Sequence, residues 1–421
     1  MSRGTDVLVI GAGLAGLTAG WQAAAAGASV SVIAKGWGAT HWHAGCVDVL
    51  GYFPLEAREP VDSPGTAAAA LAQQQPRHPY VLAGTAEMTA ALQAFQTLCE
   101  EAGYPLVGSA AQNWLLPSAV GVPRPTCLAP ATMSAGDLRR SDPMLIVGFA
   151  GLMDFNARLA ADNLAAQGQP ARAVEVEMDG MKQRRQWNSV MLARLFESPS
   201  FRDEFVRRVR PSLGEATRIG VPAVLGLHDA AALHRKLAAA LERELFEIPT
   251  LPPSVPGMRL HHILVQAIEK QGGRVQGGMD VLGAESANGR INAVYTESAA
   301  RTLLHRAETF ILATGGVLGG GIITDYQGRV REVVFNLPLA APSNRAGWLQ
   351  PTFLDSTGHP IFRAGLEVDA AWRPLRGDGA PVYDNLRAVG AALAHFDGLR
   401  ERSLEGVAVT TGFAAGRRAT V

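Results

Sequence analysis

The hexapeptide GAGLAG at residues 11–16 constrains the fold more than any other stretch of this sequence. The apolar run DVLVI precedes it, and an Ala-rich stretch with helical character follows it to about Ala26. In a G-x-G-x-x-G turn, the first glycine permits the tight bend and the second lets the backbone approach a phosphate. The third lets the helix and the strand pack closely. We therefore predict a strand–turn–helix unit that binds a nucleotide at the helix N-terminus. The predicted cofactor contacts in this turn are Gly11, Ala12, Gly13, Leu14, Ala15 and Gly16.

The strand after this helix, SVSVIA, ends at Ala34, and Lys35 follows it. A Glu or Asp usually stands there and binds the ribose of an adenine nucleotide. FMN has no adenosine and needs no such carboxylate, and Lys35 would add positive charge near its phosphate. FAD would lose one hydrogen bond, about 0.5–1.5 kcal/mol, and NADP is a weaker alternative because a small residue before Lys suits a 2′-phosphate. We predict FMN as the cofactor, with FAD as the alternative.

Two later stretches favour a flavin over NADP. The strand GRINAVYTES and the strand ending in ILATGG are similar to the pair found in flavoproteins with two dinucleotide-binding domains. The stretch NLRAVGAALAHFDG resembles the strand that completes the flavin site in that superfamily, although Ala391 stands where an Asp is common. The residues that this resemblance adds to the predicted site are Ala313, Thr314, Gly315 and Gly390.

A narrower resemblance covers most of the chain. The stretches IGAGLAGLTAG, HPYVL, VGFAGLMDFNARLAA, PTLPPSVPGMRL and NLRAVGAALAHFD are similar to those of the B subunit of anaerobic glycerol-3-phosphate dehydrogenases. The segment PTLPPSVPGMRL is the most specific of these, because a generic flavoprotein does not need it.

This resemblance implies an FMN-binding subunit of a glycerol-3-phosphate:quinone oxidoreductase, which converts glycerol 3-phosphate to dihydroxyacetone phosphate. It also implies two partners, namely a catalytic flavin subunit together with a membrane-associated iron–sulfur subunit. The expected location is the cytoplasm, at the inner face of the cell membrane through the iron–sulfur partner. Two other classes stay open: a stand-alone FAD-dependent dehydrogenase similar to fumarate reductase, and a non-catalytic assembly subunit that has lost its cofactor.

Composition excludes several functions. Lys plus Arg equals Asp plus Glu, 38 each, so net charge gives no reason to expect nucleic acid or an anionic membrane surface as a partner. The cysteines are Cys46, Cys99 and Cys127, too few for the four thiolates of a typical iron–sulfur cluster and without metal-ligand spacing. The apolar N-terminal stretch contains the glycines of the turn and lacks a signal-peptide pattern, so we predict no membrane span and no signal peptide.

Candidate catalytic side chains are few, and we predict none with a catalytic role on this chain and no metal site. His41, His43 and His395 are candidates for protonating a flavin or a substrate, although surface histidines are more common. His261 and His262 fall in a predicted helix and are interpreted as structural. Arg259 and Arg345 are candidates for binding a phosphate or a carboxylate.

The order of the predicted elements indicates an α/β protein: a Rossmann-like flavin-binding domain with an inserted α/β middle domain. We place the flavin-binding domain at residues 1–64 and 257–421 and the inserted domain, facing a partner, at residues 65–256. Helices are expected at residues 65–75 and 86–102, and a second strand–turn–helix unit at residues 143–168. The block at residues 172–251 is rich in Arg and is expected to be helical, with its charges on a solvated face or on a docking surface.

Overall fold

The structure of the protein is a computed structural model that describes residues 4–298 and 301–419. The chain forms two compact units. The first comprises Met1–Ala39, Asp48–Phe95 and His261–Val421, and the second comprises Thr40–Val47 and Gln96–Leu260. The predicted division between a flavin-binding domain and an inserted domain, at residues 64/65 and 256/257, therefore differs from the observed one. The segment from residue 65 to residue 95 folds with the N-terminal unit.

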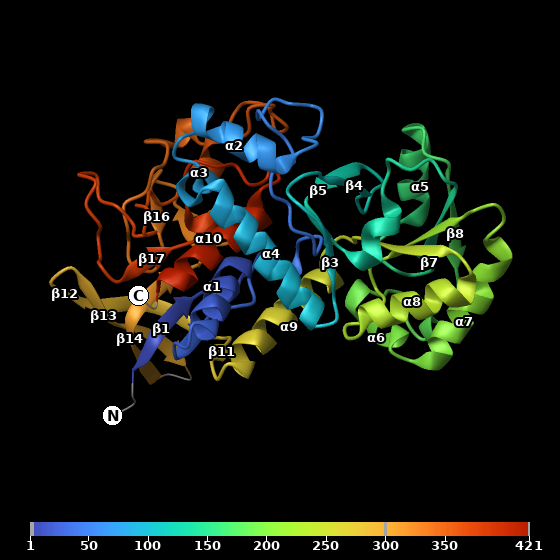
Figure 1. Ribbon diagram of the computed structural model, residues 1–421, viewed down its shortest axis with the longest axis horizontal. Coiled ribbons are helices and arrows are strands. Elements are labelled where there is room, and N and C mark those ends of the chain that lie inside the picture. Colours follow the sequence, from blue (N-terminus) through green and yellow to red (C-terminus); the bar gives the residue numbers. More distant parts are fainter. Residues whose placement is uncertain (1–3, 299–300, 420–421) are drawn as a thin grey trace. The chain divides into compact units, whose positions relative to one another are not determined.

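A mainly parallel sheet forms the centre of the first unit (Figure 1), and β1 lies in its interior. The two strands beside β1 run parallel to it, and Ile10 lies opposite Ile33 on one side and Leu312 on the other. In spatial order the strands are β11 (Arg274–Gln276), β2 (Val30–Ile33), β1 (Thr5–Ile10), β14 (Arg301–Leu312), β13 (Arg290–Ser298) and β12 (Asp280–Ala287), with β17 (Leu386–Ala388) parallel to β14.

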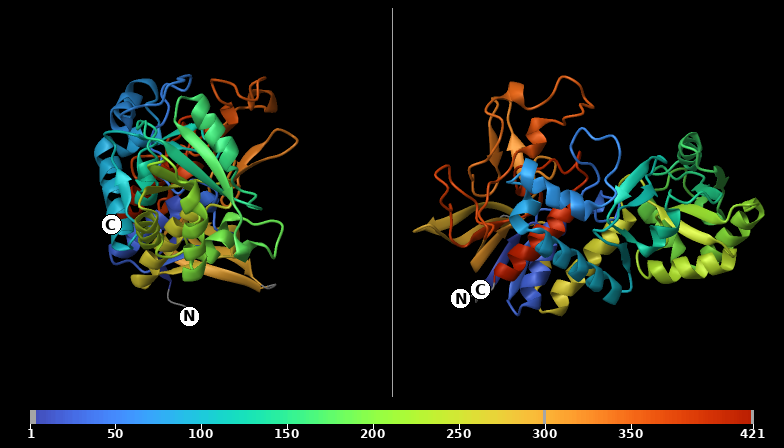
Figure 2. Two further views of the ribbon diagram at one scale, coloured as in Figure 1. Left: turned by 90° about the vertical axis from the view of Figure 1, so that its right-hand side faces the viewer. Right: turned by 45° about the horizontal axis from the view of Figure 1, so that its top comes forward.

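The apolar residues 7–10 of β1 are buried on both faces, as a central parallel strand requires. Figure 2 shows β12 and β13 projecting from the parallel part of the sheet as an antiparallel hairpin. A second, short hairpin joins β15 (Ile322–Thr324) to β16 (Val330–Glu332).

The helices begin at sequence signals that can be read locally. Ser63 accepts a hydrogen bond from the Thr66 N–H, and Pro64 occupies the first helical position, so α2 starts there. The α-helices that hold residues of the first unit are α1 (Leu14–Ala25), α2 (Pro64–Gln74), α3 (Pro79–Ala83), α4 (Thr85–Glu101), α9 (Val255–Lys270) and α10 (Leu404–Arg418).

Helices α1 and α10 lie side by side and touch through glycine. A Cβ atom at Gly412 would lie 2.4 Å from the Ala15 carbonyl oxygen, and one at Gly416 would lie 2.4 Å from the Ala19 carbonyl oxygen. Only glycine allows this approach of the two backbones. Since Ala15 belongs to the glycine-rich turn, the C-terminal helix fixes the position of that turn.

We expect Gly412→Ala to lower the free energy of unfolding by about 1–3 kcal/mol, the usual cost of overpacking a core. The added methyl group has backbone, not a flexible side chain, as its nearest neighbour. Denaturant unfolding measures the effect. Gly347→Ala is the matched control, since its nearest non-bonded neighbour would be the Pro342 Cβ atom at an ordinary 3.4 Å. If both variants have the same free energy of unfolding, the close contact between Gly412 of α10 and the glycine-rich turn does not require glycine.

The second unit contains a four-stranded parallel sheet, which corrects the expectation of a helical block at residues 172–251. Its spatial order is β10 (Glu244–Ile248), β9 (Arg218–Pro222), β7 (Met144–Phe149) and β8 (Ala171–Val176). Figure 1 shows α5 (Ala157–Ala166) on one face of this sheet, with α7 (Pro199–Val209) and α8 (Ala230–Leu241) on the other. The remaining elements of the unit are α6 (Ser189–Phe196) and two short antiparallel pairs, β3 (Leu106–Gly108) with β6 (Leu128–Pro130) and β4 (Trp114–Pro117) with β5 (Pro123–Thr126).

Short 3₁₀ helices interrupt the loops of both units. They are η1 (Ala39–His41), η2 (Ala131–Gly136), η3 (Asp179–Met181), η4 (Arg210–Ser212), η5 (Arg345–Gly347), η6 (Pro360–Arg363) and η7 (Gly390–Ala392).

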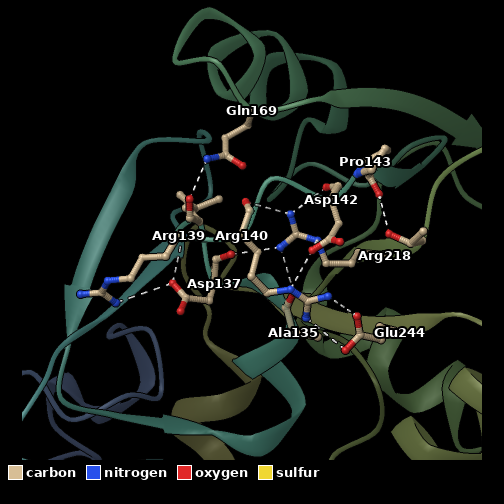
Figure 3. A network of polar contacts seen from close by, with 11 residues as sticks. Ala135, Asp137, Arg139, Arg140, Asp142, Pro143, Gln169, Arg218 and Glu244 are labelled. Atoms are coloured by element: carbon tan, nitrogen blue, oxygen red, sulfur yellow. Dashed lines mark hydrogen bonds and ion pairs between the residues drawn. The ribbon is translucent and has the colours of Figure 1, made fainter.

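One fully buried arginine anchors the loop that leads into β7 (Figure 3). Arg218, at the start of β9, donates hydrogen bonds to four backbone carbonyls of this loop, those of Ala135, Asp137, Arg140 and Asp142. The Arg140 guanidinium in turn forms a bidentate pair with Glu244 at the start of β10. These contacts lie at the N-terminal ends of the strands and we interpret them as structural.

Candidate cofactor site

Two glycines of the GAGLAG motif, one in the turn after β1 and one in the first turn of α1, serve close packing. Gly11 has a φ of +116°, and a Cβ atom there would lie 2.3 Å from the Ala313 carbonyl oxygen. A Cβ atom at Gly16 would lie 2.0 Å from the Gly11 carbonyl oxygen. Both positions therefore need glycine whether or not a ligand binds.

Gly13 differs from both of its neighbouring glycines. Its backbone has φ −78° and ψ 179°, which any residue adopts, and a Cβ atom there would meet nothing within 4 Å. Gly13 is also the N-cap residue of α1, and no side chain caps this helix end. The helix N-terminus therefore has open space beside Gly13, where a phosphate can approach its N–H groups. The side chains of Ala12, Leu14 and Ala15 are buried in the protein interior.

The end of β14 lies beside this turn. The Ala313 N–H donates a 2.8 Å hydrogen bond to the Ile10 carbonyl, which continues the pairing of β1 with β14 past the last strand residue. Thr314 follows, and its Oγ1 atom is buried without a hydrogen-bond partner in the protein. Gly315 takes a φ of +85°, which lets the chain turn away. A buried hydroxyl without a partner is costly, so Thr314 is suited to a ligand that supplies one.

The third predicted stretch reaches the same place. The Val389 N–H donates to the Leu312 carbonyl at 3.0 Å, and the Gly390 N–H donates to Thr411 Oγ1 of α10 at 2.9 Å. A Cβ atom at Gly390 would lie 2.6 Å from the Ala15 Cβ atom. The structure thus brings together the glycine-rich turn, the Ala313–Gly315 segment and Gly390, three stretches that are far apart in the sequence.

Lys35 lies in a different setting from the one predicted. Its ammonium group forms a 2.8 Å ion pair with Asp280 of β12, and its side chain is 80% exposed. The hydrogen bond from Lys35 to Asp280, together with the charge of Asp280, raises the pKa of the Lys35 ammonium. Ala34 is buried and continues the pairing of β2, donating its N–H to the Gln276 carbonyl. The Lys35 contact with a phosphate stays a prediction.

Asp397 and Glu401 belong to a polar cluster before α10 that sequence reasoning missed. His78 Nε2 lies 3.1 Å from Glu401 Oε2, and both side chains are fully buried. Burial opposes ionisation of Glu401, yet hydrogen bonds from His78 and Ser403 hold the pKa of its carboxyl below the ordinary value. Asp397 is buried as well, with Oδ2 unpartnered, and burial raises its pKa against the Arg400 N–H hydrogen bond. His78 lies in the HPYVL stretch, but its acidic partner Glu401 lies 323 residues later in the chain.

We expect Asp397→Asn to stabilise the protein increasingly as the pH rises above 3.8, the ordinary pKa of Asp. The folded-state pKa of Asp397 lies above the unfolded one, so its contribution to stability is present at low pH and is lost as the pH rises through the folded-state pKa. The amide in the variant does not ionise, so the variant does not lose this contribution as the pH rises. Melting temperatures at pH 4 and pH 8 check this; a difference between variant and wild type that does not depend on pH would contradict it.

The candidate histidines and arginines divide between structural and unassigned roles. In the second unit, burial and the nearby charges of Arg124 and His41 lower the pKa of His43 to about 3, so its imidazole is neutral at physiological pH. Burial also lowers the pKa of His41. Of the other candidates, His261 packs edge-on against Trp37, and Arg345 and His262 are exposed. Arg259 is buried in an ion pair with Glu247. His395 lies within hydrogen-bond distance of Glu367.

The site fits a phosphate-bearing cofactor and shows no metal centre. Open space at Gly13, an N-terminus of α1 without a side-chain cap, and the unpartnered Thr314 hydroxyl all suit such a group. Among the described residues, no group of three or more His, Cys, Asp or Glu side chains is placed to hold a metal ion. No helix within residues 4–298 and 301–419 combines the length and the apolar character needed to cross a membrane.

Comparison with known proteins agrees with this geometry. The family described as "FAD binding domain" matches residues 6–407. The probable anaerobic glycerol-3-phosphate dehydrogenase B subunit of Halobacterium salinarum is 34% identical, over 100% of this chain and 98% of that protein. The anaerobic glycerol-3-phosphate dehydrogenase B subunit of Pectobacterium atrosepticum is 34% identical to this chain, over 93% of both proteins. The B subunit of Yersinia pestis is 31% identical to it, over 96% of both proteins.

Proposed function

The chain belongs to the FAD binding domain family and to the family of anaerobic glycerol-3-phosphate dehydrogenase B subunits, and from this we propose that it is an electron-transfer subunit of a glycerol-3-phosphate:quinone oxidoreductase. It is a flavoprotein of the oxidoreductase class. The observation that carries the proposal is the open space beside Gly13, at the end of a helix that no side chain caps.

Each part of the site has a separate task in this proposal. The N–H groups at the start of α1 bind the cofactor phosphate, and the Thr314 hydroxyl, which has no protein partner, binds a polar group of the cofactor. Gly11, Gly16 and Gly390 keep the three backbone segments close enough to form one site. A bound flavin supplies the conversion between two-electron and one-electron chemistry.

Between the two flavins, we propose FAD. The match to a family described by FAD binding supports it, and the ribose hydrogen bond lost at Ala34 costs only about 0.5–1.5 kcal/mol. FMN, which the sequence favoured, relied partly on Lys35 as a charge near the phosphate. Lys35 is instead paired with Asp280 at the exposed edge of the sheet, and this weakens the support for FMN.

Oxidation of glycerol 3-phosphate is proposed to take place with partner subunits. The relatives are named as one lettered subunit of a dehydrogenase, which supports an assembly of several subunits, and we propose a catalytic flavin subunit together with an iron–sulfur subunit. The three cysteines of this chain are buried and are fewer than the four thiolates that an iron–sulfur cluster usually needs, which supports placing the clusters on a partner. Dye-linked dehydrogenase activity tests this: the flavin-loaded chain alone should be inactive and the reconstituted complex active. Equal turnover by both would contradict the division of labour.

The alternative of a cofactor-free assembly subunit has one specific observation in its favour. Both positions where a flavin carboxylate ligand is common hold alanine, Ala34 and Ala391. A flavin absorption spectrum of the purified chain separates the two proposals, since an assembly subunit without cofactor would be colourless.

We propose that the chain reaches the membrane through the iron–sulfur partner. Its equal numbers of acidic and basic residues, 38 each, give it no net attraction to anionic lipid. In sedimentation with anionic lipid vesicles, the lone chain should stay in the supernatant. Firm binding of the lone chain to vesicles would overturn this route.

A further inference from the structure

One surface segment of the first unit exposes several large apolar side chains. Of the sixteen large apolar side chains that are exposed in the described part of the chain, five belong to one short segment: Leu318, Tyr326, Leu349, Phe353 and Leu354. Phe353 and Leu354, the apolar pair, are 88% and 80% exposed. Single exposed leucines are normal, but several in one segment mark an interaction site. We propose that the apolar pair docks into an apolar pocket of a protein partner whose rim carries carboxylates.

Hydrogen bonds close the loop that carries the apolar pair, which runs from Trp348 to Ile361. The Ile361 N–H donates to the Trp348 carbonyl at 3.1 Å. Inside the loop, His359 Nδ1 accepts from the Gln350 N–H at 3.0 Å, and its Nε2 atom lies 2.9 Å from the Phe353 carbonyl oxygen. One imidazole thus joins both arms of the loop at the apolar pair. A side chain on a fixed backbone loses less entropy on binding, which suits an anchor residue of a protein interface.

The base of the loop is attached to the rest of the first unit. Trp348 and Ile361 are buried in a small apolar cluster. The Arg400 guanidinium donates to the Ser356 carbonyl at 2.8 Å. Only the base therefore packs inward, and the exposure of the apolar pair belongs to a well-anchored loop.

The segment leaves and rejoins the first unit beside the predicted cofactor site (orange in Figure 2). It begins after Gly316, where a Cβ atom would lie 2.4 Å from the Ala391 carbonyl oxygen. It ends before Leu366, whose N–H donates to the Ala392 carbonyl at 2.8 Å. Ala391 and Ala392 directly follow Gly390 of the cofactor site. A partner that binds this segment is therefore attached to backbone that continues from the proposed flavin site, which suits a partner that exchanges electrons with the flavin.

The charges of the segment favour a protein partner over a lipid surface. Arg331 and Arg345 are exposed, and neither forms an ion pair with a carboxylate among the described residues. Carboxylates at the rim of a protein pocket can pair with both. Asp355 directly follows Leu354, and hydrogen bonds from Thr357 hold the pKa of its carboxyl below the ordinary value. Insertion of the apolar pair into an anionic bilayer would bring this ionised group against the headgroups.

The identity of the partner rests on the proposed function. In that proposal the chain reaches the membrane through the iron–sulfur subunit, so it binds that subunit directly. The proposal does not require a direct contact with the catalytic flavin subunit. The apolar pair is therefore assigned to the contact with the iron–sulfur subunit.

Binding of the flavin-loaded chain to the purified iron–sulfur subunit, measured by biolayer interferometry, tests the inference. Phe353→Ala and Leu354→Ala should each weaken binding by about tenfold or more, because a few buried anchor residues carry most of the binding energy of an interface. Both side chains are exposed in the lone chain, so flavin content and melting temperature should stay at wild-type values. Leu282→Ala, which truncates a side chain of β12 that is 53% exposed, is the matched control and should bind as the wild type does.

The charges of the segment have a separate readout. The double variant with Arg331→Gln and Arg345→Gln should associate with the iron–sulfur subunit more slowly than the wild type, and its association rate should depend less on salt. An association rate and a salt dependence equal to those of the wild type would contradict a rim of carboxylates on the partner.

The outcomes separate this inference from the proposed function. Equal binding of the iron–sulfur subunit by wild type and by both alanine variants would overturn the inference and leave the proposed function standing. The inference is also overturned if the two variants lose binding only to the catalytic flavin subunit, to lipid vesicles or to a second copy of this chain. A flavin-loaded wild type that does not bind the iron–sulfur subunit would contradict the proposed assembly together with the inference.

Discussion

Gly13→Val should fold with the melting temperature of the flavin-free wild type and lose at least nine-tenths of the bound flavin. The backbone at Gly13 is in an extended conformation, and a Cβ atom there meets nothing within 4 Å, so the protein itself has room for the side chain. The valine fills the space from which a phosphate reaches the N–H groups of α1. A tenfold loss of flavin affinity requires a loss of only about 1.4 kcal/mol of binding free energy.

Two further variants make the result specific to position. Gly16→Ala places a Cβ atom 2.0 Å from the Gly11 carbonyl oxygen, so it should lower the melting temperature as well as the flavin content. Gly347→Val adds the same bulk at an exposed position of η5 and should change neither. Full flavin stoichiometry in Gly13→Val would place the cofactor phosphate somewhere else.

Arg259→Met should destabilise the protein by about 3–5 kcal/mol, because it leaves a buried carboxylate without its counter-charge. The Arg259 guanidinium forms two hydrogen bonds with Glu247, at 2.7 and 2.9 Å, and both residues are less than 5% exposed. It also donates to the Gly226 carbonyl, which pins the loop after β9, and to the Tyr104 hydroxyl. Denaturant unfolding of flavin-free protein measures the loss.

The pH dependence of Arg259→Met has a defined sign. In the wild type, burial opposes ionisation of Glu247, but Arg259 and the other hydrogen-bond donors hold its pKa below the ordinary value. Its contribution is therefore present above the ordinary Glu pKa and is lost as the pH falls through the lowered one. In the variant, Glu247 has lost its counter-charge and takes up a proton at a higher pH than in the wild type. The difference in the free energy of unfolding between wild type and variant should therefore become smaller as the pH falls.

Removing both partners separates the charge effect from packing. The double variant with Glu247→Leu and Arg259→Met should recover part of the lost stability, since no charge stays buried. Arg329→Met, which breaks an exposed pair with Asp325, is the control and should have little effect. If the double variant is no more stable than Arg259→Met, the arginine acts through its bonds to Gly226 and Tyr104 and not through charge.

The first βαβ unit could be predicted because its signals are local. An apolar strand, a glycine turn and an Ala-rich helix follow one another within residues 5–33, and β1, α1 and β2 lie where they were expected. The strand that ends in ILATGG was also predicted, and it is β14. The family resemblance gave the fold class and the family, both confirmed by the comparisons.

Of the second sheet, β7 and the helix α5 after it lie in the strand–turn–helix unit expected at residues 143–168. The other three strands could not be predicted, because their charges are satisfied over long distances. The stretch ERELFE has the charged pattern of an exposed helix, but β10, which begins within it, is buried at every residue except Glu244. Glu247 is tolerated there only because Arg259, from another element, is its partner. Arg218 begins β9 fully buried for a similar reason, since its partners are carbonyls of a loop about 80 residues earlier. Local periodicity carries no information on such pairs.

For the candidate site, the sequence predicted both the segments and a different role for each glycine of the motif. The contacts agree with that division, since Gly11 and Gly16 are packing positions and Gly13 is open. Sequence reasoning assigned Lys35 from its place after a strand, without the knowledge that Asp280 from a hairpin about 245 residues later would pair with it. The cluster of His78, Asp397 and Glu401 was missed for the same reason of sequence distance.

The mass and amount of flavin released by denaturing the purified chain test the central claim most directly. The account predicts one FAD per chain, held at the turn of residues 11–16 and lost in Gly13→Val. One FMN per chain would agree with a flavoprotein but would contradict the proposal that its cofactor is FAD. A chain that carries no flavin after purification, and takes up neither FAD nor FMN when they are added, would contradict the account.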